Sequence, residues 1–417
     1  MTTISFLSTF VKRKNGLKKP VPIDLDSDNL SENDDYLTLL NYINNTLDFD
    51  NLVVLAGSGT SLTFSGIAPS MDELWNRCRD DDSDLFNAVL DTVQYDRKQL
   101  NRDENGQTSN DIELLLSLCD QYLALDNLGI DESKKLSCFL ERSKKIILTA
   151  TNFTDRIKPA DWKYHDKFIR SVGRRSTKQQ RLKLFTTNYD LAFEHSAANT
   201  GFVVVDGFEF SSPSYFNPSW FRYDIVDRSD NSKNSSSYIS NVLQLYKMHG
   251  SVNWTRDNGR VKKLDYKANI ENPVFIYPSC TKYQTSYDSP YLDMMSAFLH
   301  SLQQPKTALI CLGFGFNDKH INNAVTMALR TNPEFNLLIA TKEPFDTRGS
   351  FNPDIRDLLH AAILEGDRRI AIIDGEFSTF SDLLQERRKE TPEEKIFKTF
   401  ETLAANVAGN SKDENAF

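Results

Sequence analysis

The last third of the chain alternates short apolar runs with amphipathic segments. The apolar runs lie in TALICLGFGF, FNLLIAT and RRIAIID, and the segments between them, HINNAVTMALR and DIRDLLHAAILE, have helical periodicity. Apolar strands that alternate with helices pair in parallel, and the helices cover both faces of the sheet. The pattern therefore predicts an α/β fold with a doubly wound, Rossmann-like and mostly parallel sheet.

The first half of the chain supplies two strands and a long helical stretch between them. The apolar run 52–55 predicts the first strand, residues 72–150 have mostly helical patterns, and the second strand starts at Arg181. We therefore expect one domain over residues 36–376, with a helical insertion at about 72–180.

The two ends of the chain have a different character. Residues 1–35 combine the basic KRKNGLKKP with the acidic DSDNLSENDD, and neither stretch offers much apolar surface to bury. We expect a flexible tail there, with a docking arm for a partner as the alternative. Residues 377–417 become helical and charged and close on GNSKDENAF, which predicts a C-terminal helical segment and a tail.

Composition narrows the class of protein. With 39% hydrophobic and 26% charged residues the chain is typical of a globular protein, and its net charge of −9 argues against nucleic-acid binding as its main task. The basic stretch RSVGRRSTKQQRLK is more simply a solvated loop than a polyanion site. The longest apolar run is too short to cross a bilayer, so we expect a cytoplasmic protein without a membrane span.

The cysteines and histidines give no pattern of metal ligands. No C-x-x-C pair occurs, so we expect neither a zinc ribbon nor a disulfide framework, which suits a reducing compartment. The histidine spacing also predicts no metal site. The cysteines are Cys78, Cys119, Cys138, Cys280 and Cys311.

One stretch, NLVVLAGSGTS, runs from an apolar strand directly into glycines and hydroxyl residues. The turn Gly57-Ser58-Gly59-Thr60-Ser61 would bring backbone N–H groups close to an anion, because glycine permits close approach of the main chain. Position 62 is not glycine, so the full dinucleotide fingerprint is missing. From these residues alone, the turn is either a phosphate site or a tight structural turn.

Three later strands also end in polar or glycine residues. FTTNYD ends in Thr187, Asn188 and Asp190, YKMHGS carries His249, and CLGFGFND carries Gly313 and Phe314. Ligands of doubly wound sheets bind at the carboxyl ends of the strands. Asn188 and Asp190 either line such a site or cap the following helix.

These four stretches, in this order, resemble the sirtuin-like domains, and among them the NAD-consuming branch of bacterial antiphage defence systems. GSGTSLTFSGIAPS matches the phosphate loop, Thr186–Asp190 the Thr-x-Asn-x-Asp motif, and His249-Gly250 the His-Gly pair, while GFGFNDKHI approximates the late glycine strand end. The resemblance covers residues 40–375.

The chain departs from the family pattern at two positions and in one module. Ser58 stands where the family usually has alanine, and Gly315 lies near a position where protein deacylases carry a hydroxyl residue. The paired C-x-x-C motifs of the deacylating sirtuins, which help to form the groove for an acyl-lysine peptide, are also missing. The resemblance therefore implies simple cleavage of NAD+ rather than protein deacylation.

The resemblance implies an NAD+ glycohydrolase that releases nicotinamide and ADP-ribose and needs no metal. In that family pattern Asn188 contacts the nicotinamide ribose and orients water, Asp190 anchors that end of the pocket, and His249 is the general base. The residues that would bind NAD+ are Gly57, Ser58, Gly59, Thr60, Ser61, Thr187, Gly313 and Phe314.

The resemblance also implies partners and a biological role. It suggests a homo-oligomer that depletes NAD+ in antiphage defence, is held silent until triggered, and acts with a HerA-type hexameric ATPase. The sequence contains no Walker loop, so that ATPase would be a separate chain. Two alternatives remain open: a non-catalytic sensor of NAD or ADP-ribose, and a nuclease component of a defence complex.

Overall fold

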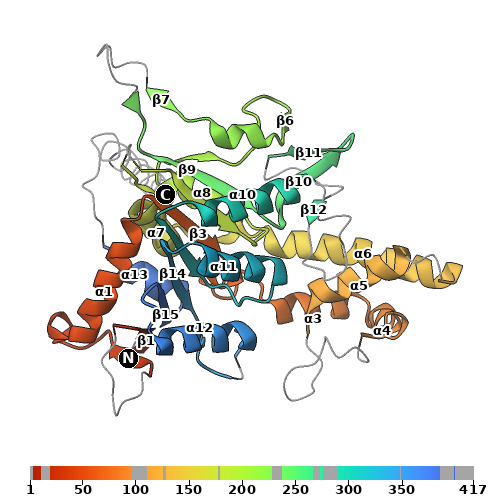
Figure 1. Ribbon diagram of the computed structural model, residues 1–417. Coiled ribbons are helices and arrows are strands. Elements are labelled where there is room, and N and C mark those ends of the chain that lie inside the picture. Colours follow the sequence, from red (N-terminus) through yellow and green to blue (C-terminus); the bar gives the residue numbers. More distant parts are fainter. Residues whose placement is uncertain are drawn as a thin grey trace, which may run out of the picture.

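The fold is organised around one large mixed sheet, shown in Figure 1. The computed structural model describes residues 3–10, 19–95, 110–124, 128–176, 179–227, 237–265, 273–275, 289–347, 349–385 and 399. In order across the sheet, the strands are β2 (Val21–Asp24), β1 (Thr3–Ser8), β15 (Ile370–Asp374), β14 (Phe335–Thr341), β13 (Thr307–Leu312), β3 (Asn51–Ala56), β4 (Leu182–Thr186), β9 (Val242–Lys247) and β5 (Val203–Val205).

All neighbours from β15 to β5 are parallel, whereas β1 is antiparallel to β15 and β2 to β1. The chain runs from β3 to β4 on one side and returns later to β13 on the other side. The strand order therefore reverses between β3 and β13, and this is where ligands of such sheets bind. The predicted doubly wound, mostly parallel fold is confirmed.

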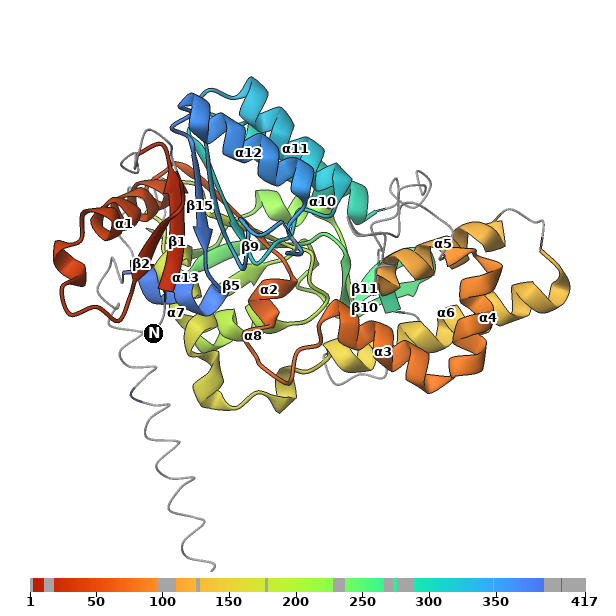
Figure 2. The same ribbon diagram turned by 90° about the horizontal axis from the view of Figure 1, so that it is seen from below.

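Helices cover both faces of this sheet, as Figure 2 shows. Alternate residues of β3 face opposite sides: Leu52 and Val54 pack on one side, Val53 and Leu55 on the other. The first face is covered by α1 (Asp34–Leu47), α7 (Lys163–Gly173), α8 (Ala192–Asn199) and α13 (Phe377–Leu383). The second face is covered by α10 (Tyr291–Gln303), α11 (Lys319–Thr331) and α12 (Pro353–Glu365).

Between β3 and β4 the chain forms a helical module that extends to one side of the sheet (Figure 2). Its helices are α3 (Met71–Asp81), α4 (Ser83–Thr92), α5 (Ile112–Ala124) and α6 (Ile130–Thr151). They share a core of their own, which includes Trp75 and Phe86 and also takes in Tyr189 and Val252 from the main domain. The module therefore packs directly against the loop that follows β4.

Smaller elements complete the structure. A second sheet has the order β12 (Pro273–Phe275), β10 (Gly250–Asp257), β11 (Arg260–Lys263) and β6 (Ser214–Tyr215), and β7 (Val226–Asp227) pairs with β8 (Ser237–Tyr238). The short helix α2 (Ser58–Ser61) follows β3. Among the described residues, short 3-10 helices occur at Leu30–Glu32, Thr154–Arg156, Pro159–Trp162 and Pro218–Arg222.

The N-terminal segment differs from the flexible tail that the sequence led us to expect. Residues 3–8 and 21–24 form two strands at the edge of the main sheet. The reason is a short alternation of apolar residues: Ile4, Phe6 and Ile23 are at most 2% exposed and join the core. Most of the basic stretch between these strands and most of the expected C-terminal segment lie outside the described residues.

Candidate active site

The turns that follow β3 and β13 touch one another at the point where the strand order reverses. The Gly57 N–H donates to the Leu312 carbonyl at 2.9 Å, and the Gly59 N–H donates to the Gly313 carbonyl at 3.0 Å. A Cβ atom on Gly59 would lie 2.7 Å from the Cα of Gly313, and Gly313 has a φ of +54°. Glycine is needed at both positions because two main chains pack against each other without room for a side chain.

This contact explains why the turn after β3 contains glycine. The turn also has a surface that an anion such as a phosphate can reach, because Ser58 is exposed and Gly59 is partly exposed beside the packed backbone. The inner side of the turn therefore packs against the main chain after β13, and its outer side is accessible to solvent.

Asn188 ties the end of β4 to this turn. Its Nδ2 lies within hydrogen-bond distance of the Gly57 carbonyl at 3.0 Å, of Thr60 Oγ1 at 3.1 Å and of Ser61 Oγ at 2.9 Å. The side chain is buried, and its backbone N–H donates to the Thr186 hydroxyl at 3.1 Å. An amide fits here because it can donate to carbonyl and hydroxyl oxygens while it keeps an acceptor oxygen.

Asp190 makes a second link to the same turn. Its Oδ2 accepts from Ser61 Oγ at 2.7 Å, and its Oδ1 accepts from the backbone N–H of Ala192 at 2.9 Å. Asp190 therefore bonds to both the first residue of α8 and the glycine turn, although the N-cap position of α8 is Leu191.

Lys247, the last residue of β9, holds the main chain of the stretch 187–190, which follows β4. Its Nζ donates to the carbonyls of Tyr189 and Asp190 and lies 3.1 Å from Glu194 Oε1. The lysine is 2% exposed, so these contacts hold its charge inside the protein. The loop that carries Asn188 is therefore held by a buried cation as well as by the turn.

His249 follows β9 and meets Asp318 from a distant part of the chain. His249 Nε2 lies 3.3 Å from Asp318 Oδ2, and both side chains are 5% exposed. Asp318 also caps α11, because its Oδ1 accepts from the N–H groups of His320 at 2.8 Å and Ile321 at 3.2 Å. Burial alone would raise the pKa of Asp318, but the bonds from His249 and these N–H groups bring it below its usual value.

Glu113, a residue of the helical module, lies near the His249–Asp318 pair. Its Oε1 accepts from the Tyr189 hydroxyl at 2.8 Å. Burial raises the pKa of Glu113 to about 7; His249 and Tyr189 act against this rise, and Asp111 and Asp318 add to it. These mutual effects place Glu113 within electrostatic range of the His249–Asp318 pair.

All the residues predicted for the site lie at the same edge of the sheet. Thr187 donates its N–H to the Ala56 carbonyl at 3.1 Å and is partly exposed, while Phe314 is buried with its ring 5.0 Å from that of Phe316. The sequence analysis missed Asp318 and Glu113. The position of Asp318, two residues before the start of HINNAVTMALR, was a helix-cap signal, whereas Glu113 lies inside an amphipathic helix and gave no signal.

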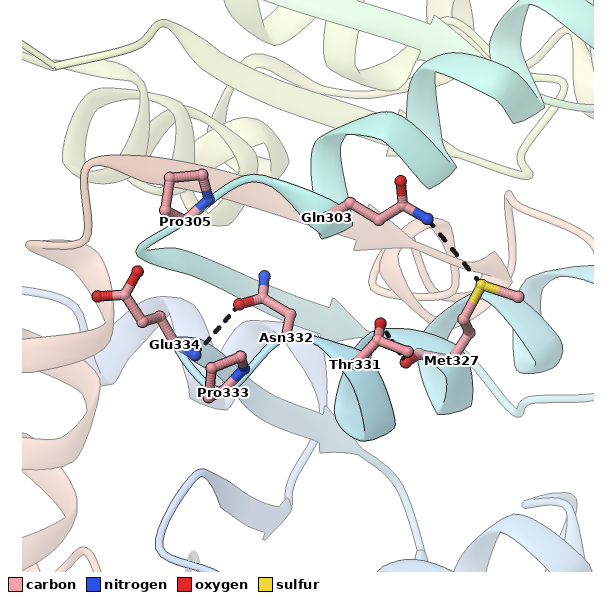
Figure 3. Close-up of a pocket in the computed structure, with 7 residues that line it drawn as sticks. All are labelled: Gln303, Pro305, Met327, Thr331, Asn332, Pro333 and Glu334. Carbon is pink, nitrogen blue, oxygen red and sulfur yellow. Dashed lines mark hydrogen bonds between the residues drawn. The ribbon is translucent and has the colours of Figure 1, made fainter.

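A cavity of about 490 Å³ lies elsewhere, and Figure 3 shows its lining. It is formed where α10 and α11 end and β13 and β14 begin, which is the opposite edge of the sheet from His249. Its lining residues are Gln303, Pro305, Met327, Thr331, Asn332, Pro333 and Glu334. A single carboxylate among neutral side chains offers no pair for acid–base chemistry, so the candidate site is at the strand reversal.

The described part of the chain offers neither a metal cluster nor a membrane-spanning helix. Within the described ranges, no group of three or more His, Cys, Asp and Glu residues is placed to hold a metal ion. Among the helices that the structure describes, none is long and apolar enough to cross a membrane.

Comparison with known proteins gives a family match for part of the chain. Residues 182–351 match the family model of the SIR2-like domain, a stretch that contains Asn188, Asp190, His249 and Asp318. No curated protein matches the chain.

Several solved structures are similar at low identity. A structure of Sir2Tm bound to a propionylated peptide is 13% identical, with a TM-score of 0.31, and the match covers 80% of this chain and 97% of that one. A Sir2 structure in complex with the inhibitor EX-527, 2'-O-acetyl-ADP-ribose and a deacetylated p53 peptide is 13% identical, with a TM-score of 0.32, and the match covers 80% and 98%. The family match, rather than these likenesses, is what bears on the site.

Proposed function

We propose that this protein is an NAD+ glycohydrolase, which cleaves NAD+ to nicotinamide and ADP-ribose. The observation that carries the proposal is a set of polar side chains that follow the carboxyl ends of the strands. Asn188 and Asp190 hydrogen-bond to the glycine turn. His249, which follows β9, is paired with Asp318, which lies between β13 and α11. All four residues lie in the stretch that matches the SIR2-like domain.

Binding would begin at the turn between β3 and α2. Because the Gly57 and Gly59 N–H groups already donate to the end of β13, the exposed rim of the turn from Gly57 to Ser61 would receive the pyrophosphate. Thr187, Gly313 and Phe314 would be further walls of the site. Because Asn188 Nδ2 already donates to this turn, its Oδ1 would be the atom that accepts a hydrogen bond from the ribose or from the attacking water. Such a fixed arrangement lowers the entropy cost of bringing water to the reacting carbon.

Cleavage would proceed through an oxocarbenium-like state of the ribose. The C1′–N bond breaks, and its electron pair returns to the nicotinamide ring, which leaves uncharged. Water then bonds to C1′, and its proton passes to His249, directly or through a ribose hydroxyl. A buried histidine with a carboxylate partner suits this step, since the carboxylate stabilises the imidazolium that forms.

The histidine pair also favours an enzyme over the alternative of a pure sensor. A protein that only binds NAD or ADP-ribose needs no paired base at the nicotinamide end of its pocket. The biological role remains part of the proposal: depletion of NAD+ in antiphage defence, in the cytoplasm, by a homo-oligomer under the control of a HerA-type ATPase. Its support is the motif resemblance and the need to restrain an activity that would kill the host.

The test is to incubate the purified chain with NAD+ and to quantify nicotinamide and ADP-ribose, with and without an acyl-lysine peptide. We expect equal amounts of both products, independent of the peptide. Asn188→Ala should reduce the rate by at least about 10²-fold. Asn45→Ala, an exposed position of α1, is the matched control and should retain the rate.

Two outcomes would contradict the proposal. Product formation that requires the peptide would indicate acyl transfer. A rise of the melting temperature with NAD+ but no products would indicate a sensor.

A further inference from the structure

Asp318 lies in the stretch GFGFNDKHI, where the motif resemblance assigns it no role, yet its carboxylate is the group that faces His249. We propose that Asp318 is a positioning residue: it holds His249 in the tautomer whose Nδ1 accepts the proton during NAD+ cleavage. The effect of Asp318 on turnover rests on the proposed function, but its effect on the tautomer of His249 can be tested without any enzymatic activity.

The two oxygens of the Asp318 carboxylate have different tasks. Oδ1 accepts from the backbone N–H groups of His320 and Ile321 and thereby caps α11. Oδ2 faces His249 Nε2 at 3.3 Å. A carboxylate only accepts hydrogen bonds when it is ionised, so the proton of the neutral imidazole must sit on Nε2. The lone pair is then on Nδ1, and Nδ1 is the base.

The loop that presents Asp318 is held rigidly. The Gly313 N–H donates to the Ala340 carbonyl at 2.9 Å, and Asn322 Nδ2 donates to the Phe316 carbonyl at 2.6 Å. The ring of Phe316 is fully buried. With the loop fixed at both ends and at the cap of α11, the carboxylate is preorganised toward His249.

Other titratable groups surround the pair. Glu113 of α5 interacts with both His249 and Asp318, and Asp111 lies next to Glu113. Burial raises the pKa of Tyr291 of α10, and the negative charge of Asp318 adds to this rise. Glu113 acts through its field, whereas Asp318 is at bonding distance, so the tautomer is set by Asp318.

The competing explanation is that Asp318 only caps α11. Asp318→Asn separates the two, because asparagine is an equally good cap. Its oxygen must turn to the N–H groups of His320 and Ile321, which leaves the NH₂ group facing His249. An NH₂ group donates, so Nε2 would have to accept and the proton would move to Nδ1. The cap is preserved while the tautomer inverts.

The tautomer can be read by NMR of protein labelled with ¹⁵N-histidine, with His249→Gln used to assign the signal. For the uncharged imidazole, we expect a protonated Nε2 in the wild-type protein and a protonated Nδ1 in D318N. Asp82→Asn is the matched control: Asp82 caps α4 through the Leu85 N–H at 3.0 Å, and its exchange should leave the His249 signal unchanged. The same His249 tautomer in wild type and D318N would overturn the proposal, whether or not the protein cleaves NAD+.

The rate of NAD+ cleavage provides a second test of the role of Asp318. D318N should cleave NAD+ about 10²-fold more slowly, with NAD+ binding within a few-fold of wild type, and Asp82→Asn should retain its rate. The turnover of wild type and D318N should also be compared in a Glu113→Gln background, because burial raises the pKa of Glu113 to about 7 and its titration would otherwise add to the pH dependence of the rate. Wild-type turnover of D318N, despite an inverted tautomer, would show that Nδ1 is not the base.

Discussion

A Cβ atom on Gly59 would lie 2.7 Å from the Cα of Gly313, so the turns after β3 and β13 are in direct main-chain contact. We therefore expect Gly59→Val to lower the free energy of unfolding by about 1–3 kcal/mol, as overpacking does. Thermal or urea unfolding measures this. Gly129→Ala is the control, because its nearest contact would be 3.6 Å from Glu132 Oε2. Unfolding of Gly59→Val at the wild-type midpoint would refute the packing role.

Phe6 of β1 gives a test of the N-terminal strands. Its side chain is fully buried, so Phe6→Ala should cost about 3–5 kcal/mol of stability. Phe10→Ala, at a side chain 51% exposed, is the comparison and should change the midpoint little. Equal midpoints for the two variants would mean that residues 3–8 behave as a loose tail.

Because Glu113 is buried, we expect the protein to lose stability as the pH rises from 4.5 to neutral. Because burial raises its pKa from 4.5 to about 7, the folded protein binds more protons than the unfolded chain between these values. Stability contributed by this group is therefore present at low pH and is lost as pH rises from 4.5 through 7, by at most about 1.4 kcal/mol per unit. Denaturant unfolding from pH 4.5 to 8 should show a shallower decline for Glu113→Gln. Parallel curves for the two proteins would contradict the assignment.

Because His165 is buried, we expect the protein to lose stability as the pH falls below 6.5. It is fully buried against the rings of Phe64, Phe193 and Phe377, and its two ring nitrogens have no hydrogen-bond partner among the described residues. Burial lowers its pKa to about 3. The unfolded chain then binds the extra proton below pH 6.5, so stability should fall as pH decreases from 6.5 toward 3.

His165→Phe keeps an aromatic ring in this cluster and removes the titrating group. We expect the variant to lose much of the acid sensitivity seen in denaturant unfolding between pH 6.5 and 4, with NAD+ cleavage unchanged. The same decline in wild type and variant would place the acid sensitivity elsewhere.

Much of the fold and half of the site could be predicted because the relevant signals are local. Apolar strands that alternate with helices defined the sheet, and strand ends rich in glycine and polar residues marked one edge of it. The His249–Asp318 contact joins residues 69 positions apart, and it depends on how far each strand end reaches across the reversal. Glu113 enters from a separate helical module, and its contact with Tyr189 is fixed only by how that module packs.

The N-terminal strands were missed for another reason. β1 and β2 are short and flank a basic stretch. β2 pairs with β1, and β1 depends on β15, which is 369 positions away in the pair Ser5↔Asp374. Their few apolar residues were outweighed by the charged surroundings in the sequence. The packing of Gly59 against Gly313 was hidden for the same reason, since it joins two separate strand ends.

The most direct test of the account is nicotinamide release from NAD+ by wild type and by His249→Ala, measured together with the NAD+-induced shift of the melting temperature. The account predicts release by wild type, a rate at least about 10²-fold lower for the variant, and a thermal shift in both proteins. Undiminished release by His249→Ala, or a thermal shift without release by wild type, would contradict it.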